Sequence, residues 1–268
     1  MDPLQGSEAI QQFKKLLEGN NREGQAADLS ALMWYMDGMT RQYEAVLREL
    51  QNVRQQLDQE REPPVQYVAQ KAAATLEHKA HQLKGTLDSL WERIAGCAAS
   101  AVESFKEIGV SALDKALAAM DVKNVLESLR DHLNNSIADT KRSIEKVENI
   151  GCELRSVGGH LRNAGRAMAG KETLAVDGGQ EGRFQSAVLA PMRAAQKLLC
   201  GMNNATLAAI GCVEHMEQTA KDAREARAER QAKKKPSVRQ ALAEKKAEAA
   251  AQSIPSPEKE HKSQEAAL

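Results

Sequence analysis

Aromatic residues are scarce in this chain: three Phe, three Tyr and two Trp make up 3% of its 268 residues. All of them except Phe184 lie before residue 106. Large rings normally supply much of the buried area of a compact core. Ala, Leu, Lys, Glu, Gln and Arg fill the chain instead, a composition typical of long helices that pack through small contacts. We therefore predict an elongated, all-α protein rich in coiled coil.

Several sequence signals of membrane insertion, export and catalysis are also missing. No run of about 18 uncharged apolar residues could span a membrane. The start, MDPLQGSEAI, lacks the basic and apolar parts of a signal peptide, so we expect a cytoplasmic protein with reduced cysteines. No nucleotide-binding glycine motif and no catalytic constellation emerges from residue spacing. Glu77, His78 and His81 are too few to hold a metal. We predict no enzyme activity, cofactor or metal.

Charge is balanced over the chain but unevenly distributed. Residues 1–62 carry 11 acidic and 7 basic side chains, whereas residues 221–248 carry 10 basic and 5 acidic ones. Bases of this kind attract polyanions weakly and in a salt-dependent way. No aromatic residue accompanies them for base stacking. The candidate polyanion contacts are Lys233, Lys234, Lys235, Arg239, Lys245 and Lys246.

The clearest pattern is an unbroken heptad repeat in the first quarter of the chain. Nine residues recur at alternating spacings of three and four, which predicts a helix with one apolar side for pairing with another helix. Pro63 and Pro64 cannot continue this helix. We call the nine residues the helix-pairing seam: Leu29, Leu32, Met36, Met39, Tyr43, Val46, Leu50, Val53 and Leu57.

Trp34 lies on the opposite side of the same helix, at heptad position f. Ala31 and Gly38 beside it leave room for a close approach. Two interpretations follow from this position. Trp34 packs against another helix of the same chain, or it anchors a partner protein, as Trp often does at interfaces.

Further along the chain, periodicity and turn signals define the remaining segments. One apolar stripe at helical spacing comprises Leu126, Leu129, Leu133, Ile137, Ile144, Val147, Leu154 and Leu161. Gly109 marks a bend, Asp121 marks a cap or joint, and DGG marks a turn. We predict a short helix and loop in 1–24, the heptad helix in 25–62, a long amphipathic helical region in 65–169, a loop in 170–183, a long helix in 184–230 and a mostly disordered basic tail in 231–268. Within that tail, Ser237 and Gln240 form a capping box for a short basic helix.

Three segments together resemble a known type of protein. They are DLSALMWYMDGMTRQYEAVLREL, AVLAPMRAAQKLLCGMNNATLAAIGCVEHME and KKPSVRQALAEKKAEA. The chain is similar, over most of its length, to an uncharacterised helical family encoded on bacterial conjugative and mobile elements. The resemblance implies a bacterial cytoplasmic accessory protein of such an element. It brings no catalytic residues with it.

These features favour a non-enzymatic structural or adaptor protein that pairs its helices with themselves or with another helical protein. The alternative is a nucleic-acid-associated accessory factor that uses the basic C-terminal segment. A third hypothesis, an amphipathic protein that coats a membrane surface, is weaker because such helices normally carry bulky apolar groups opposite Lys and Arg. The middle of this chain is poor in aromatics and neutral.

Overall fold

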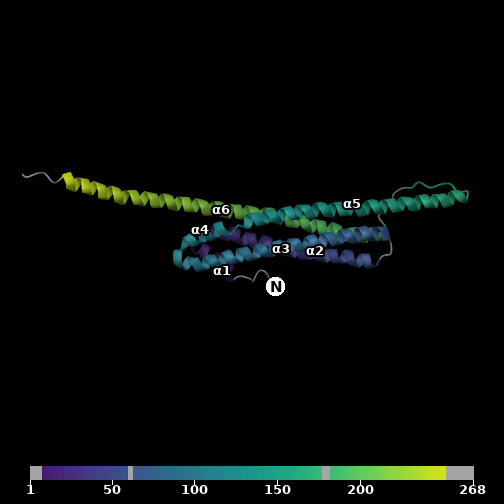
Figure 1. The fold of residues 1–268 in the computed structure, drawn as a ribbon, viewed down its shortest axis with the longest axis horizontal. Coiled ribbons are helices and arrows are strands. Elements are labelled where there is room, and N and C mark those ends of the chain that lie inside the picture. The colour runs from purple at the N-terminus through teal and green to yellow at the C-terminus, as the bar shows by residue number, and fades with distance from the viewer. Residues whose placement is uncertain (1–7, 60–62, 177–181, 252–268) are drawn as a thin grey trace, which may run out of the picture. The chain divides into compact units, whose positions relative to one another are not determined.

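The computed structural model of the protein describes residues 8–59, 63–176 and 182–251. All regular secondary structure in these ranges is helical, which confirms the all-α prediction (Figure 1). The chain divides into two compact units, residues 1–220 and residues 221–268, and α6 contributes to both. The helices are α1 (Glu8–Glu18), α2 (Glu23–Gln59), α3 (Pro63–Ile108), α4 (Val110–Ala119), α5 (Val122–Met168) and α6 (Arg183–Ala251).

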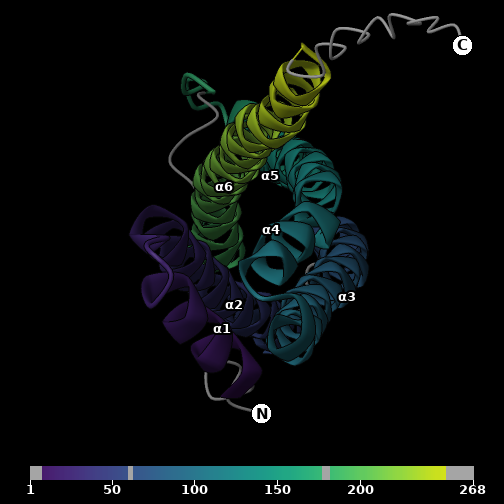
Figure 2. The same ribbon diagram turned by 90° about the vertical axis from the view of Figure 1, so that its left-hand side faces the viewer.

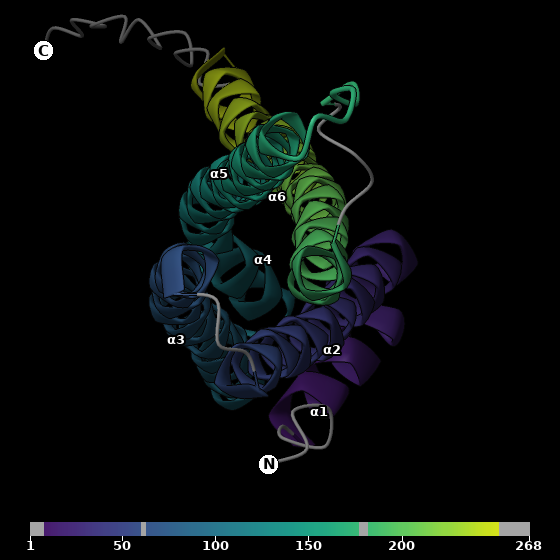
Figure 3. The ribbon, with the colours of Figure 1, turned by 90° about the vertical axis from the view of Figure 1, so that its right-hand side faces the viewer.

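The first unit is built on four helix segments that surround one interior: α2, α3, α5 and residues 183–220 of α6 (Figures 2 and 3). Neighbouring segments run antiparallel, because residue numbers rise along one segment as they fall along the next. This is the up-down-up-down arrangement of a four-helix bundle. The contacts that show it are Arg54–Glu77 and Leu57–Gln66 for α2 and α3, Lys79–Asp139 and Arg93–Asp121 for α3 and α5, Lys123–Glu214 and Glu148–Arg193 for α5 and α6, and Gln25–Thr219 and Met39–Thr206 for α6 and α2.

The core of this bundle contains the helix-pairing seam. All nine of its side chains are buried inside the first unit. Leu50, for example, lines the same interior space as Leu83 of α3, Thr140 of α5 and Leu199 of α6. The seam therefore packs against helices of its own chain, and burial of this apolar surface is the main force that holds the bundle together.

The structure divides the long amphipathic helical region predicted for 65–169 into α3, α4 and α5. Gly109 has φ of 59° and ψ of −144°, a backbone conformation that glycine adopts far more readily than other residues. Asp121 has φ of 43° and ψ of 32°, in the left-handed region that Asp tolerates. The bend and the joint expected at these two positions are thus complete helix breaks. Between them α4 returns along α3, where the Cys97 Sγ lies 3.8 Å from the Ala119 carbonyl oxygen.

A buried ion pair fixes α4 to the loop between α1 and α2. The Arg22 guanidinium donates to the Asp114 carboxylate at 2.8 Å, and both side chains are largely shielded from water. Removing one partner of such a pair leaves an uncompensated buried charge, which typically costs about 3–5 kcal/mol. The pair therefore helps to set the position of this short helix, together with its buried apolar residues Leu113 and Leu117.

Two glycines allow the helices of the bundle to approach closely, and each faces a glutamine. The Gln185 amide lies against Gly151 and donates to the Val147 carbonyl at 3.2 Å and to the Glu148 carbonyl at 3.1 Å. A Cβ at Gly151 would collide with this amide. Gly201 of α6 receives Gln42 of α2 in a similar way. These contacts fix the register of α6 against its two neighbours.

One helix boundary differs strongly from the sequence-based one. The heptad helix is described as far as Gln59, and its expected last residues, 60–62, lie outside the described residues. The last helix, expected to end at residue 230, continues to Ala251. Residues 231–251 are rich in Ala, Lys, Glu, Gln and Arg, the best helix formers, so helix propensity outweighs the lack of apolar residues there. Residues 252–268, also expected in the tail, lie outside the described residues.

Candidate functional site

The C-terminal end of α5, residues 152–168, extends past the ends of its neighbours in the bundle (Figure 1). Gln185, close to the start of α6, accepts a hydrogen bond from Arg155 and lies beside Gly151. Buried positions recur along α5 from Val122 to Gly151 and stop there. Beyond that point the helix continues without the cover of α6.

Apolar residues nevertheless continue along this exposed end. Leu154, Val157, Leu161 and Met168 follow the spacing of three and four that also describes the buried part of the helix, with Ala164 filling the remaining position. We call these four large residues the α5 stripe. Leu161 is 74% exposed and Met168 is 92% exposed. The sequence-based stripe that included Leu154 and Leu161 is therefore a core stripe only as far as Val147.

An extended segment, residues 171–176, runs back along another side of the same helix end. The Asn163 side chain donates to the Leu174 carbonyl at 2.6 Å and accepts from the Leu174 N–H at 2.9 Å. Arg166 donates to the Glu172 carbonyl at 2.8 Å. Gly159 provides space for Val176, which lies 2.7 Å from where a Cβ would be. The segment braces the helix end and leaves the α5 stripe open.

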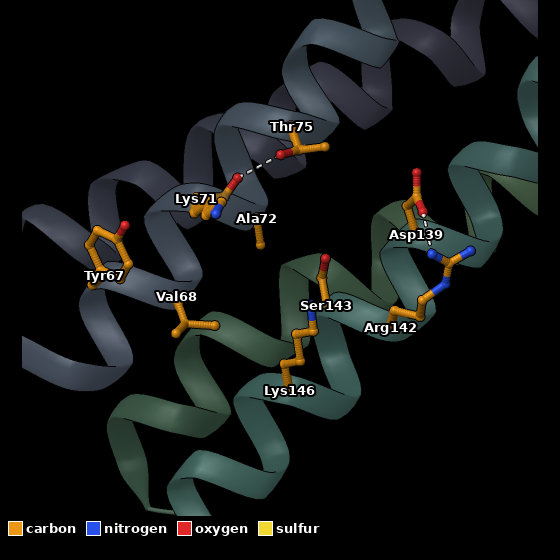
Figure 4. A pocket seen from close by; sticks show the side chains of 9 residues that line it. All are labelled: Tyr67, Val68, Lys71, Ala72, Thr75, Asp139, Arg142, Ser143 and Lys146. Carbon is orange, nitrogen blue, oxygen red and sulfur yellow. Dashed lines mark hydrogen bonds and ion pairs between the residues drawn. The ribbon is translucent and has the colours of Figure 1, made fainter.

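A cavity of about 380 Å³ lies between α3 and α5 (Figure 4). Tyr67, Lys71 and Thr75 line it from α3 at intervals of four residues. From α5 the lining residues include Asp139, Arg142, Ser143 and Lys146. Asp139, the one acidic residue in the lining, pairs with Lys79 of α3 and lies 3.3 Å from Arg142. The cavity lining therefore carries an excess of positive charge.

Trp34 is 66% exposed on the outer side of α2. Its ring contacts the neighbouring Tyr35 ring edge-on, with 5.1 Å between the ring centres. Among the described residues, no second helix covers it, so the intrachain packing considered from the sequence is not what the structure contains. The anchor for a partner remains a prediction.

The six candidate polyanion contacts fall in the part of α6 that belongs to the second unit. Lys245 is exposed. The side chains of Lys233, Lys234, Lys235, Arg239 and Lys246 lie outside the described side chains, although their backbone is helical. The capping-box position Ser237 lies inside α6, so the short basic helix expected there is part of a longer one.

Three groups that could serve chemistry, Glu77, Cys97 and Cys212, are engaged or partly shielded. Glu77, considered with His78 as a metal ligand, forms an ion pair with Arg54. Burial raises the pKa of the Cys97 thiol, an effect that Arg93 partly offsets, and burial together with Asp28 raises the pKa of the Cys212 thiol. A higher pKa lowers the fraction of reactive thiolate. In the described ranges, no group of three or more His, Cys, Asp or Glu is placed to hold a metal ion.

The sequence signal for the α5 stripe was present in its 3-4 spacing, but the signal does not distinguish a covered stripe from an open one. The cavity was missed because Lys71 and Lys146 lie far apart in the chain.

Across the described ranges, no helix combines the length and apolar content that a membrane crossing requires.

Comparison with known proteins places the chain in one family. Neither the curated proteins nor the solved structures include a match to it. A family described as of unknown function matches residues 6–265, which is nearly the whole chain. The protein therefore belongs to DUF6674, a family of unknown function.

Proposed function

We propose that the protein is a non-enzymatic adaptor that binds an amphipathic helix of another protein on the α5 stripe. The observation that carries this proposal is the exposure of Leu154, Val157, Leu161 and Met168 on one side of a braced helix end. Contiguous exposed apolar surface on a protein commonly marks an interaction site. A helix is a suitable occupant, because residues at 3-4 spacing pair with residues of the same spacing in coiled-coil fashion.

The helix-pairing seam does not serve this role in the proposal. Its nine residues are buried within the bundle, and exposing them would require the first unit to open. Such an opening would forfeit the burial that stabilises the fold. The α5 stripe, in contrast, is available without any change in the bundle. Trp34 offers a second exposed contact on α2 for the same or another partner.

Charge around the α5 stripe indicates the chemistry of the partner. Residues 152–176 contain four bases, Arg155, Arg162, Arg166 and Lys171, and two acids, Glu153 and Glu172. Two copies of this surface would bring like charges together, which disfavours self-pairing. A partner helix with an apolar stripe and acidic flanks would be attracted. We therefore favour a different protein over a second copy of this chain.

The test compares capture from the native host by three forms of the intact protein. The wild type and Leu207→Glu, a control at another exposed leucine on α6, are expected to retain the same helical partner. Leu161→Glu combined with Met168→Glu is expected to weaken binding of that purified partner at least about tenfold, as loss of apolar anchors does. Calorimetry with the partner's acidic helix measures the affinity directly.

Two outcomes would overturn the proposal. The first is a capture profile that is identical for the double variant and the wild type. The second is a stable dimer in sedimentation equilibrium that Leu161→Glu with Met168→Glu dissociates. That result would assign the α5 stripe to self-association instead of to an adaptor role.

Binding of nucleic acid by the second unit is the second candidate function. It is supported by the 10 basic and 5 acidic residues of 221–248 and by the exposure of Lys245. Contacts of this kind are electrostatic and weaken steeply as salt rises. An electrophoretic shift assay with and without residues 221–268 tests it. A shift that persists without these residues, or no shift at low salt, would reject this function.

The biological setting is proposed from the resemblance alone. We propose that the adaptor acts in a bacterial cytoplasm as an accessory protein of a mobile element. The test is to sequence the DNA that flanks its gene and to fractionate the native cells. Flanks without transfer or integration genes, or protein recovered outside the cytoplasmic fraction, would contradict it.

A further inference from the structure

We propose that the cavity between α3 and α5 binds a nucleotide, with its phosphates held by Lys71, Arg142 and Lys146 and its base stacked on Tyr67. This site is distinct from the α5 stripe and does not depend on the adaptor role. Its two walls are helices that pack against each other in the bundle, so the lining residues are held at a set spacing (Figure 4).

Uncompensated positive charge points to an anionic ligand. Asp139 is already engaged by Lys79 and by Arg142. Among the described residues, neither Lys71 nor Lys146 has a carboxylate partner. Cations held close together across a cleft repel one another, and an anion bound between them attracts each of them.

The acids nearest to Lys146 along α5 leave this charge in place. Glu145 and Glu148 lie within two residues of Lys146 in the chain, but neither lines the cavity. Glu148 instead forms an ion pair with Arg193 of α6, at 2.5 Å. The positive charge of the lining is therefore open to a ligand from solution.

The donors available suit phosphate. Arg142, whose Nη1 lies 3.3 Å from Asp139, keeps its other N–H donors for phosphate oxygens, and the two lysines act as point charges from opposite helices. The Ser143 hydroxyl has no hydrogen-bond partner among the described residues and lines the cavity. The Thr75 hydroxyl, in contrast, already donates to the Lys71 carbonyl at 2.9 Å. The free hydroxyl of Ser143 adds a neutral donor beside the cations.

Tyr67 indicates where a base would lie. Its side chain is 67% exposed, an unusual position for a large ring in a chain with so few. In Figure 4 the ring occupies one end of the cavity and Arg142 the other, with Lys71 and Lys146 on facing helices between them. Stacking on an aromatic ring is worth about 1–3 kcal/mol per base. The phosphates would then lie over the lysines and extend toward Arg142.

Size favours a single nucleotide over a nucleic-acid strand. The volume of about 380 Å³ is within the range of roughly 300–1,000 Å³ that small-molecule sites occupy. A strand-binding groove normally offers several aromatic platforms in succession. Tyr67 is the one aromatic residue in this lining.

The experiment is calorimetric titration of the intact protein, without divalent metal, with three probes: ADP, pyrophosphate and adenosine. We expect ADP to bind most tightly, pyrophosphate more weakly and adenosine barely. Lys71→Gln combined with Lys146→Gln should weaken both ADP and pyrophosphate at least about tenfold, because charged hydrogen bonds are lost. Tyr67→Ala should weaken ADP about tenfold and leave pyrophosphate unchanged.

Lys141→Gln combined with Lys197→Gln is the matched control, since it removes the same charge from exposed positions outside the cavity. It should bind all three probes as the wild type does. Equal weakening in the control would show diffuse ionic attraction and overturn the site. So would the absence of ADP and pyrophosphate binding at millimolar concentration. Circular dichroism of each variant confirms that the helices are retained, and none of these outcomes bears on the α5 stripe.

Discussion

The two parts of α5 have similar apolar patterns, but the apolar side is buried in one part and exposed in the other. From Val122 to Gly151 the apolar side of the helix is buried against α3 and α6, whereas from residue 152 onward the same kind of side faces outward. The difference lies in the neighbouring helices, because α6 begins at Arg183 and its residue Gln185 meets α5 at Gly151 and Arg155. An amphipathic pattern thus indicates that a helix has an apolar side. Whether that side is buried depends on how far the neighbouring helices extend along it.

The largest expected effect contrasts Leu133 with Leu161. Leu133→Asp places a charge in the bundle core and should lower the free energy of unfolding by about 3–5 kcal/mol. Leu161→Asp, on the exposed end, should change it by no more than about 0.5 kcal/mol. Urea unfolding followed by circular dichroism measures both. Similar losses in the two variants would mean that the α5 end is covered in solution.

Substitutions of two glycines, one in each part of α5, test the same contrast between the buried part and the exposed part. Gly151→Ala would force the Gln185 amide out of its place and should cost about 1–3 kcal/mol, the usual range for overpacking. Gly165→Ala has open space around its new methyl group and should stabilise the helix by up to about 1 kcal/mol. Melting temperatures rank the two variants. A stabilising Gly151→Ala would show that Gln185 does not lock α5 to α6.

A smaller, local effect is expected at the brace on the α5 end. Asn163→Ala removes both hydrogen bonds to Leu174, so the Leu174 amide should exchange its hydrogen roughly tenfold faster. Global stability should change by less than about 1 kcal/mol. Hydrogen exchange read by NMR tests this, with Asn204→Ala as a control at an exposed asparagine. Unchanged exchange at Leu174 would contradict the brace.

The least disruptive test uses the native thiols. Cys97 and Cys212 have pKa values raised by burial, so near neutral pH less of each is thiolate, and alkylation should be slow and should accelerate as pH rises. Cys152, at the start of the exposed α5 end, should react first, together with the exposed Cys200. Mass spectrometry of partly alkylated protein gives the order. Protection of Cys152 alone would reveal a cover over the α5 end.

Much of the fold was predictable. The 3-4 spacing of the helix-pairing seam gives α2 its apolar side, and that side is buried. Gly109 and Asp121 both have positive φ, and they mark the two helix breaks. The chain does not merely bend there: it reverses direction and forms the separate helix α4. The helix boundary at residue 230 was misplaced because apolar content ends there while helix propensity continues to Ala251.

Far less of the candidate sites was predictable. Trp34 was placed on the outer side of α2 by heptad register, but its exposure depends on where α1 and α6 lie. The cavity between α3 and α5 joins Lys71 to Lys146, which no local pattern connects. Gln185 and Gly151 likewise meet only because α5 and α6 run antiparallel in one particular register.

The sequence by itself determined the helices, since their hydrogen bonds are local and their apolar sides repeat at a period that can be counted. It also determined the charge of each segment. The tertiary structure alone decided which apolar stripes became core and which stayed open. That outcome depends on where the helices begin and end relative to one another. Leu133 and Val147 of α5 are buried inside the bundle. Leu161 and Met168 of the same helix face water, because α6 begins short of the C-terminal end of α5.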